Sequence, residues 1–361
     1  MAITRRNLLE GAAVTAALTG LSNPARLIAA DTEQALTRIA FGSCCHQDKE
    51  QPIWDRVNAW NPELFIFLGD NIYGDTVDMA LMRAKYGKLA AKPGFRALRR
   101  QSRIVATWDD HDYGMNDAGY EYPKKQESKA LFLEFWNEPA DSPRRSREGI
   151  YTSYMFGPEG RRVQVILPDN RTFRSPLMGM TVEPEGAGNY LVNPDPKATM
   201  LGAAQWDWLE EELRKPADFR ILASSTQVLA DAPGYEAWIN FQADHQRLLD
   251  LIDFAGVENL VMISGDTHYA ELSRLTENVP YPLYDLTSSG LTQVWESFGP
   301  NRNRIAKAPL APNFGRIAID WDAKDGAGRP DPHMTMEVQM LDGSIAIQHR
   351  LRQSELKQGG R

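Results

Sequence analysis

The sequence predicts an α/β protein whose parallel strands lie buried beneath helices. Its core strands are short apolar runs without a polar break, such as Leu64–Leu68 and Leu260–Ser264. Such runs are typical of strands covered on both faces. Both runs are followed directly by Gly-Asp, and segments of helical character separate the strands. Because sheets of this class place ligands beyond the carboxyl ends of their strands, we expect the functional residues there.

The first 30 residues are predicted to be a removable signal. Arg5 and Arg6 precede an apolar stretch over residues 11–21, and small residues follow up to Ala30, the order found in secretory signals. The arginine pair is similar to a twin-arginine signal; a frayed amphipathic helix is the alternative. We therefore expect the Tat export machinery as a partner and a periplasmic or extracellular location, without a stable membrane anchor.

Without residues 1–30 the chain keeps 37 Lys and Arg against 47 Asp and Glu. This acidic balance argues against general binding of nucleic acid or anionic membranes, so nucleic acid is expected only as a substrate, if at all. Residues 31–355 suffice for a single catalytic domain. That domain ends in a hairpin around Asp342-Gly343, and residues 356–361 form a tail.

The first strand, Arg38–Phe41, leads into Cys44 and Cys45, the only cysteines of the chain. Neighbouring cysteines can close only a strained bridge. Either the pair is idle, or one thiolate is a ligand or nucleophile. We expect Cys45 to be a packed, inert thiol.

A helix is predicted over Pro52–Trp60 before the second strand, Leu64–Leu68, and Asp70 and Tyr73 follow that strand. The glycine before Asp70 lets the backbone turn and approach a ligand closely. Taken alone, Asp70 also suits a helix N-cap. A second helix is predicted from Asp78 to about Ala91.

The third strand, Arg103–Trp108, ends in a crowded run that contains Asp109, Asp110, His111 and Asp112. Three carboxylates and an imidazole in four residues are costly unless a cation or hydrogen bonds absorb the charge. A solvated acidic turn is the alternative, which the preceding apolar strand disfavours.

The fourth strand, Val163–Leu167, is followed by Asp169 and Arg171. A guanidinium matches an oxyanion in a bidentate way, so Arg171 is a phosphate-binding candidate. A surface ion pair with Asp169 is an equal alternative. Residues 174–203 are rich in Pro and Gly and predict a surface excursion, after which an amphipathic helix covers Ala204–Arg214.

The fifth strand, Ile221–Ser225, is followed by Gln227, and the sixth, Leu260–Ser264, by Asp266 and His268. A further strand and turn are predicted over residues 284–291. Together the strand ends offer thiolate, carboxylate, phenolate, guanidinium and imidazole groups, a combination that favours a metal site. Two metals that share one carboxylate would activate water and stabilise an in-line displacement at phosphorus.

Four segments resemble, in chain order, the motifs of the PhoD-like alkaline phosphatase family (alkaline phosphatase D) of the calcineurin-like metallophosphoesterase superfamily. They are Phe41–Cys44, Gly69–Tyr73, Trp108–Asp112 and Ser264–His268. The resemblance extends from about Ile39 to Gly290 and implies a four-layer α/β/β/α sandwich with mixed sheets. Pro168, where the family usually has leucine, is a departure that removes a backbone donor.

The resemblance also implies a metal centre with assigned residues. Fe³⁺ would be held by Cys44, Asp70, Tyr73 and Asp266, with Asp70 shared with Ca²⁺. Asp110, Asn116 and His268 would bind calcium or support the second site, and zinc or manganese are the alternative metals. His111 would lie near the substrate as an acid or orienting group, and Arg171 would hold the phosphate. Asp109, Asp169 and Gln227 are further candidates.

The implied function is an exported alkaline phosphatase or phosphodiesterase. It would hydrolyse phosphate monoesters, diesters or both at alkaline pH through a metal-bound hydroxide. A phospholipase-D-like phosphodiesterase on the same fold is the nearest alternative, and a binding protein with a degenerate site is an alternative of another class. A serine hydrolase is disfavoured because no Gly-x-Ser-x-Gly elbow is present.

Overall fold

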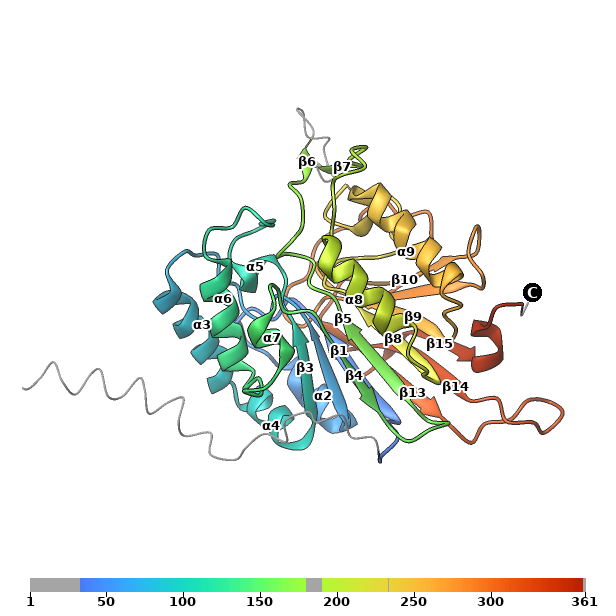
Figure 1. The fold of residues 1–361 in the computed structure, drawn as a ribbon. Coiled ribbons are helices and arrows are strands. Elements are labelled where there is room, and N and C mark those ends of the chain that lie inside the picture. The colour runs from blue at the N-terminus through green and yellow to red at the C-terminus, as the bar shows by residue number, and fades with distance from the viewer. Residues whose placement is uncertain (1–32, 180–189, 233, 360–361) are drawn as a thin grey trace, which may run out of the picture.

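The computed structural model describes residues 33–179, 190–232 and 234–359. The predicted signal lies outside the described residues, as does part of the predicted surface excursion. The described part consists of two large mixed sheets, a small two-stranded sheet and helices (Figure 1). Within this part, no helix has both the length and the apolar character needed to cross a bilayer.

The first sheet has six strands in the order β15-β14-β13-β1-β2-β3. β1, β2 and β3 run parallel, whereas β13 pairs with β1 in the antiparallel direction. β2 is the unbroken apolar run of the sequence, and all of its residues are buried. The strands are β1 (Arg38–Gly42), β2 (Leu64–Leu68), β3 (Arg103–Thr107), β13 (Asn313–Asp320), β14 (His333–Met340) and β15 (Ile345–Arg352).

The second sheet has seven strands in the order β12-β10-β11-β9-β8-β5-β4. Its centre is parallel, from β5 through β8 and β9 to β11. Antiparallel strands flank this centre, with β4 on one side and β10 and β12 on the other. The strands are β4 (Thr152–Phe156), β5 (Val163–Leu167), β8 (Phe219–Ala223), β9 (Leu260–Ser264), β10 (Ala270–Leu275), β11 (Leu283–Ser288) and β12 (Arg304–Lys307).

Helices cover the outer face of each sheet, which gives four layers in the order α/β/β/α (Figure 1). Side chains alternate along a strand. Phe65 and Phe67 therefore pack in the core with the helices, while Leu64 and Ile66 belong to the core shared with the second sheet. The predicted α/β fold with mixed sheets is confirmed.

The helices on the first sheet are α2 (Ile53–Trp60), α3 (Met79–Ala91), α4 (Pro93–Gln101) and α6 (Lys125–Phe135). Those on the second sheet are α8 (Ala203–Leu213) and α9 (Gln242–Phe254). Short elements complete the described chain: α5 (Asp110–Tyr113), α7 (Pro143–Ser146), η1 (Trp238–Asn240), η2 (Gln353–Leu356) and the strand pair β6 (Met178–Gly179) and β7 (Tyr190–Leu191).

The predicted helices agree with α2, α3 and α8 to within one residue at each end, and the predicted hairpin is β14–β15. The strands β4, β10 and β13 were not predicted from the sequence. In β10 the reason is a buried charge, because Glu271 is fully buried and forms an ion pair with Arg304. Leu356, which was predicted to lie in the tail, is buried in η2.

Candidate metal centre

The carboxyl ends of strands from both sheets meet and bring together most of the predicted site residues. Asp70 follows β2, Asp110 follows β3 and Asp266 follows β9. Their side chains take part in clusters whose ligand atoms lie within 4.8 Å of one another. Two sheets therefore contribute to one site. The clusters are Cys44–Asp70–His268, Asp70–Asp110–His111, Asp109–Asp110–Asp266 and Asp110–Asp117–Glu236.

Strained backbone holds several of these residues at the strand ends. The φ angles of Cys44, Asp70 and Asp266 are 62°, 50° and 73°, in the left-handed region that residues with a Cβ seldom adopt. Such strain persists only where the surrounding structure fixes it, and it concentrates at functional sites. No described helix begins at Asp70, so the N-cap alternative for this residue is wrong.

One side of the site joins a thiol, a carboxylate and a phenol. Cys44 Sγ and Tyr73 OH lie 3.4 Å and 3.3 Å from the same oxygen, Asp70 Oδ2. The Tyr73 hydroxyl also lies 2.9 Å from Nε2 of His268. The ring of Tyr73 packs against His111, with centroids 4.2 Å apart. The arrangement offers sulfur, oxygen and nitrogen ligand atoms around one carboxylate.

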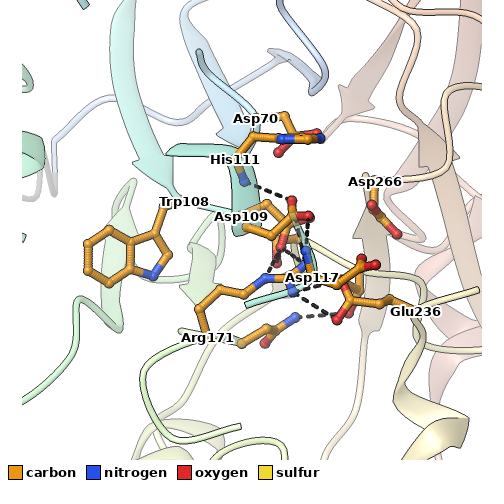
Figure 2. A network of polar contacts seen from close by, with 12 residues as sticks. Asp70, Trp108, Asp109, His111, Asp117, Arg171, Glu236 and Asp266 are labelled. Carbon is orange, nitrogen blue, oxygen red and sulfur yellow. Dashed lines mark hydrogen bonds and ion pairs between the residues drawn. The ribbon is translucent and has the colours of Figure 1, made fainter. Parts of the chain in front are cut away.

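The other side is a buried network around Arg171 (Figure 2). The Arg171 Nε donates to Asp109 Oδ1 at 2.6 Å, and its Nη1 donates to Glu236 Oε1 at 2.8 Å. Arg171 is fully buried, so the alternative of a surface ion pair with Asp169 is wrong. Asp109 and Asp110 are also buried, which contradicts a solvated acidic turn.

His111 lies half-buried on the short helix α5. Its Nδ1 forms an ion pair with Asp75 Oδ1 at 2.7 Å, and its backbone N–H donates to Asp110 Oδ1. Burial lowers the pKa of His111, but Asp70 and Asp110 outweigh burial and raise the pKa to about 11.

The carboxylates repel one another in low-dielectric surroundings. Burial raises the pKa of Asp70 well above its ordinary value, and Asp110 and Asp109 add to the rise although His111 opposes it. Burial also raises the pKa of Asp109 to about 6, against the opposing charge of Arg171. Burial and mutual repulsion thus both disfavour the charged forms of these carboxyl groups unless a further cation lies beside them.

The ligand atoms of this site are suited to binding cations. Asp70 Oδ1 and Asp109 Oδ2 are buried and have no hydrogen-bond partner among the described residues. A buried carboxylate oxygen without a donor is costly, and a metal ion is the usual partner of such an oxygen. The clustered carboxyl groups and these two oxygens agree with the metal site that the sequence predicted.

Two predicted site residues, Asp169 and Gln227, lie apart from the clusters, and a third, Asn116, lies at their edge. The Asn116 side chain is exposed and donates to Asp117. The Asp169 carboxylate stabilises the turn after β5, because it accepts hydrogen bonds from Trp108 Nε1 and from several backbone N–H groups. Gln227 points elsewhere and donates to Glu271 and Thr287.

Asp117 and Glu236, which complete the cluster with Asp110, were not among the site residues predicted from the sequence. Asp117 lies only five residues after Asp112 in the same acidic run, so its sequence position was a usable signal. Glu236 follows no strand, and nothing in its local sequence marks it. Burial raises the pKa of Glu236 to about 8, although Arg171 and Arg174 oppose the rise.

Comparisons with known proteins agree with this geometry. The model of a family described as PhoD-like phosphatase matches residues 39–301. A solved structure of PhoD is 15% identical with a TM-score of 0.60, covering 90% of this chain and 73% of that chain. A structure of TT1561 from Thermus thermophilus is 13% identical and covers 71% of this chain and 91% of that one. Its TM-score of 0.36 is too low to indicate a shared fold. No protein with a curated description matches the chain.

Proposed function

Because the chain belongs to the PhoD-like phosphatase family, we propose that it is an exported, metal-dependent phosphoesterase active at alkaline pH. Its substrates would be phosphate monoesters, diesters or both. The observation that carries this proposal is the convergence of thiol, phenol, imidazole and carboxylate groups from both sheets at one site. An intact, buried donor set of this kind disfavours the alternative of a binding protein with a degenerate site.

We propose ferric iron and calcium as the resident cations, with zinc or manganese as the alternative. Cys44 and Tyr73, together with Asp70 and Asp266, would hold the iron, since thiolate and phenolate are ligands of that ion. The oxygen-only cluster of Asp110, Asp117 and Glu236 suits a hard cation such as calcium. Cations there would supply charge neutralisation at phosphorus and an activated water.

The chain's own residues have separate tasks in this proposal. The Asp75 contact with Nδ1 fixes the His111 ring, so Nε2 is the atom that would donate a proton to the leaving oxygen. Arg171 would keep Asp109 and Glu236 in place. Its charge would also stabilise the negative phosphoryl group.

The test of the proposed function is to purify the protein without chelators, measure its metals and record its visible spectrum. Iron and calcium together, with an absorption band that Tyr73→Phe or Cys44→Ser removes, would support the assignment. A colourless protein that holds zinc or manganese would keep the phosphoesterase but reject the iron. No metal after reconstitution, with no ester hydrolysis, would overturn the proposal in favour of a binding protein.

Substrate preference is tested in the same preparation with p-nitrophenyl phosphate, bis-p-nitrophenyl phosphate and phosphatidylcholine at matched alkaline pH. Faster hydrolysis of the first identifies a monoesterase, and faster hydrolysis of the second a diesterase. Release of choline from the lipid would favour the phospholipase-D-like alternative. Export is tested separately, by replacing Arg5 and Arg6 with lysine. If the twin-arginine route is used, this variant should stay in the cytoplasm.

A further inference from the structure

A cavity of about 490 Å³ lies on the flank of the sandwich, between β3 of the first sheet and β4 of the second. Both are edge strands, and each pairs with a single neighbour. Residues of α4, α7 and α8 complete the walls. None of the residues assigned to the metal centre lines it. Its volume falls within the range of about 300–1,000 Å³ that is usual for small-molecule sites.

One wall carries a guanidinium and an indole that lack strong partners. Arg99 lies over the rings of Phe95 and Phe135, 5.8 Å and 5.7 Å from their centroids. Its one hydrogen bond, to the Phe135 carbonyl oxygen, is 3.5 Å long, and no carboxylate of the described chain pairs with it. Trp136 packs against Phe135, and its Nε1 is buried without an acceptor among the described residues.

Arg147 and Trp208, which also line the cavity, repeat this chemistry. Arg147 lies over the rings of Tyr151 and Trp208, 4.4 Å and 5.8 Å from their centroids. Its Nε is buried, and in the described part of the chain it meets no acceptor and no carboxylate. The cavity is thus lined by two guanidinium groups, each beside aromatic rings and without a carboxylate partner among the described residues.

The remaining charges of the cavity are largely balanced. Arg144 pairs with Glu138 at 3.1 Å, and Lys215 pairs with Glu212 at 2.7 Å. Asp141 lines the cavity but is exposed. The groups that lack partners inside are therefore donors and cations, in a chain whose formal net charge is −8.

We propose that this cavity is a binding site, separate from the metal centre, for an organic anion with a flat aromatic body. An aryl sulfonate or aryl carboxylate has the required chemistry. Its oxygens would accept from the guanidinium groups of Arg99 and Arg147, because hydrogen bonds between a cationic donor and an anionic acceptor are the strong ones. Its ring would lie against the aromatic walls, and cation–π contact already places both guanidinium groups beside rings.

The test uses the full-length, metal-loaded protein and naphthalene-2-sulfonate as the probe, with binding measured by titration calorimetry and by tryptophan fluorescence. Naphthalene-2-sulfonamide, which has the same shape but no charge, should bind at least tenfold more weakly. Sulfate alone should not compete. Excess inorganic phosphate, which would bind at the metal centre, should leave the affinity of the probe unchanged.

Variants locate the site. Arg99→Met and Arg147→Met should each weaken binding of the probe about tenfold or more. Arg100→Met is the matched control, because Arg100 is exposed on the same helix as Arg99. The affinity of this variant for the probe should stay within twofold of the unchanged protein. Circular dichroism and the midpoint of thermal unfolding show whether each variant is folded. Binding of the probe reports on the cavity, and ester hydrolysis reports on the metal centre.

The proposal is overturned if the probe does not bind at millimolar concentration, or if the neutral sulfonamide binds as well as the sulfonate. Displacement of the probe by phosphate would place it in the metal centre and would also reject the cavity. Equal losses in Arg99→Met and Arg100→Met would indicate a general effect of surface charge. Each of these results leaves the phosphoesterase proposal untouched, since that one is decided by metal content and ester hydrolysis.

Discussion

Asp112 fixes the backbone of Asp70, because its Oδ1 accepts the Asp70 N–H at 3.0 Å. The same oxygen accepts the N–H of Asp109 at 2.7 Å, and Oδ2 accepts the Asn71 side-chain amide at 2.5 Å. Asp112 is 1% exposed. One buried carboxylate, which is itself in none of the metal-ligand clusters, thus connects the ends of β2 and β3.

Replacing Asp112 by alanine should therefore destabilise the whole site. Two buried backbone N–H groups would lose their acceptor, at about 1–3 kcal/mol each, so we expect the free energy of unfolding to fall by about 3 kcal/mol. Urea unfolding measures the change. Asp55→Ala, at an exposed position of α2, is the control and should stay within about 0.5 kcal/mol. Equal stability of both variants would contradict the role given to Asp112.

Gly69→Ala should be strongly destabilising. Gly69 has φ of 95°, and an added Cβ would lie 2.4 Å from Asp109 Cβ and 2.6 Å from Asp109 N. We expect a loss of about 2 kcal/mol or more, from strain and overlap together. Gly87→Ala is the matched control, because Gly87 lies in α3 with open space around it, and it should gain up to about 1 kcal/mol. Thermal unfolding of the two variants should therefore shift in opposite directions.

Lys85 should act as a positioning residue for the Tyr73 loop. Its Nζ donates to the carbonyl oxygens of Tyr73 and Gly74, both at 2.8 Å. Hydrogen bonds from a charged donor contribute about 1.5–3 kcal/mol, so Lys85→Met should lower kcat/KM about tenfold and weaken any absorption band from Tyr73. Lys88→Met removes only an exposed ion pair with Asp48 and should stay within about twofold. An unchanged spectrum and rate in Lys85→Met would reject this role.

Asp70→Asn should remove both metal and activity, because Asp70 belongs to two clusters and has an unpartnered buried oxygen. Changing residues that only hydrogen-bond to a ligand costs about 10–100-fold, so the loss of turnover should be about 100-fold or more. Metal analysis and ester hydrolysis are measured on the same sample, with Asp55→Asn as the control. Full metal content with normal turnover would refute the site.

The sequence by itself determined where the central strands lie and which acidic residues follow them. β2, β5 and β9 have the predicted bounds, because a strand buried on both faces needs an unbroken apolar run, and such a run is visible locally. Asp70 and Asp266 were identified by the same local logic, since each follows a strand and a glycine. The predicted helices also depend on patterns within a few turns.

Only the tertiary structure decided which side chains meet. Glu236 comes after no strand, yet it pairs with Arg171, 65 residues away in sequence. Gln227, at a strand end, turns instead toward Glu271. The strand β10 and the ion pair of Arg304 with Glu271 were likewise hidden, because a buried charge resembles a surface residue until its partner is known. Contacts of this kind depend on how two sheets pack, and no local pattern encodes that packing.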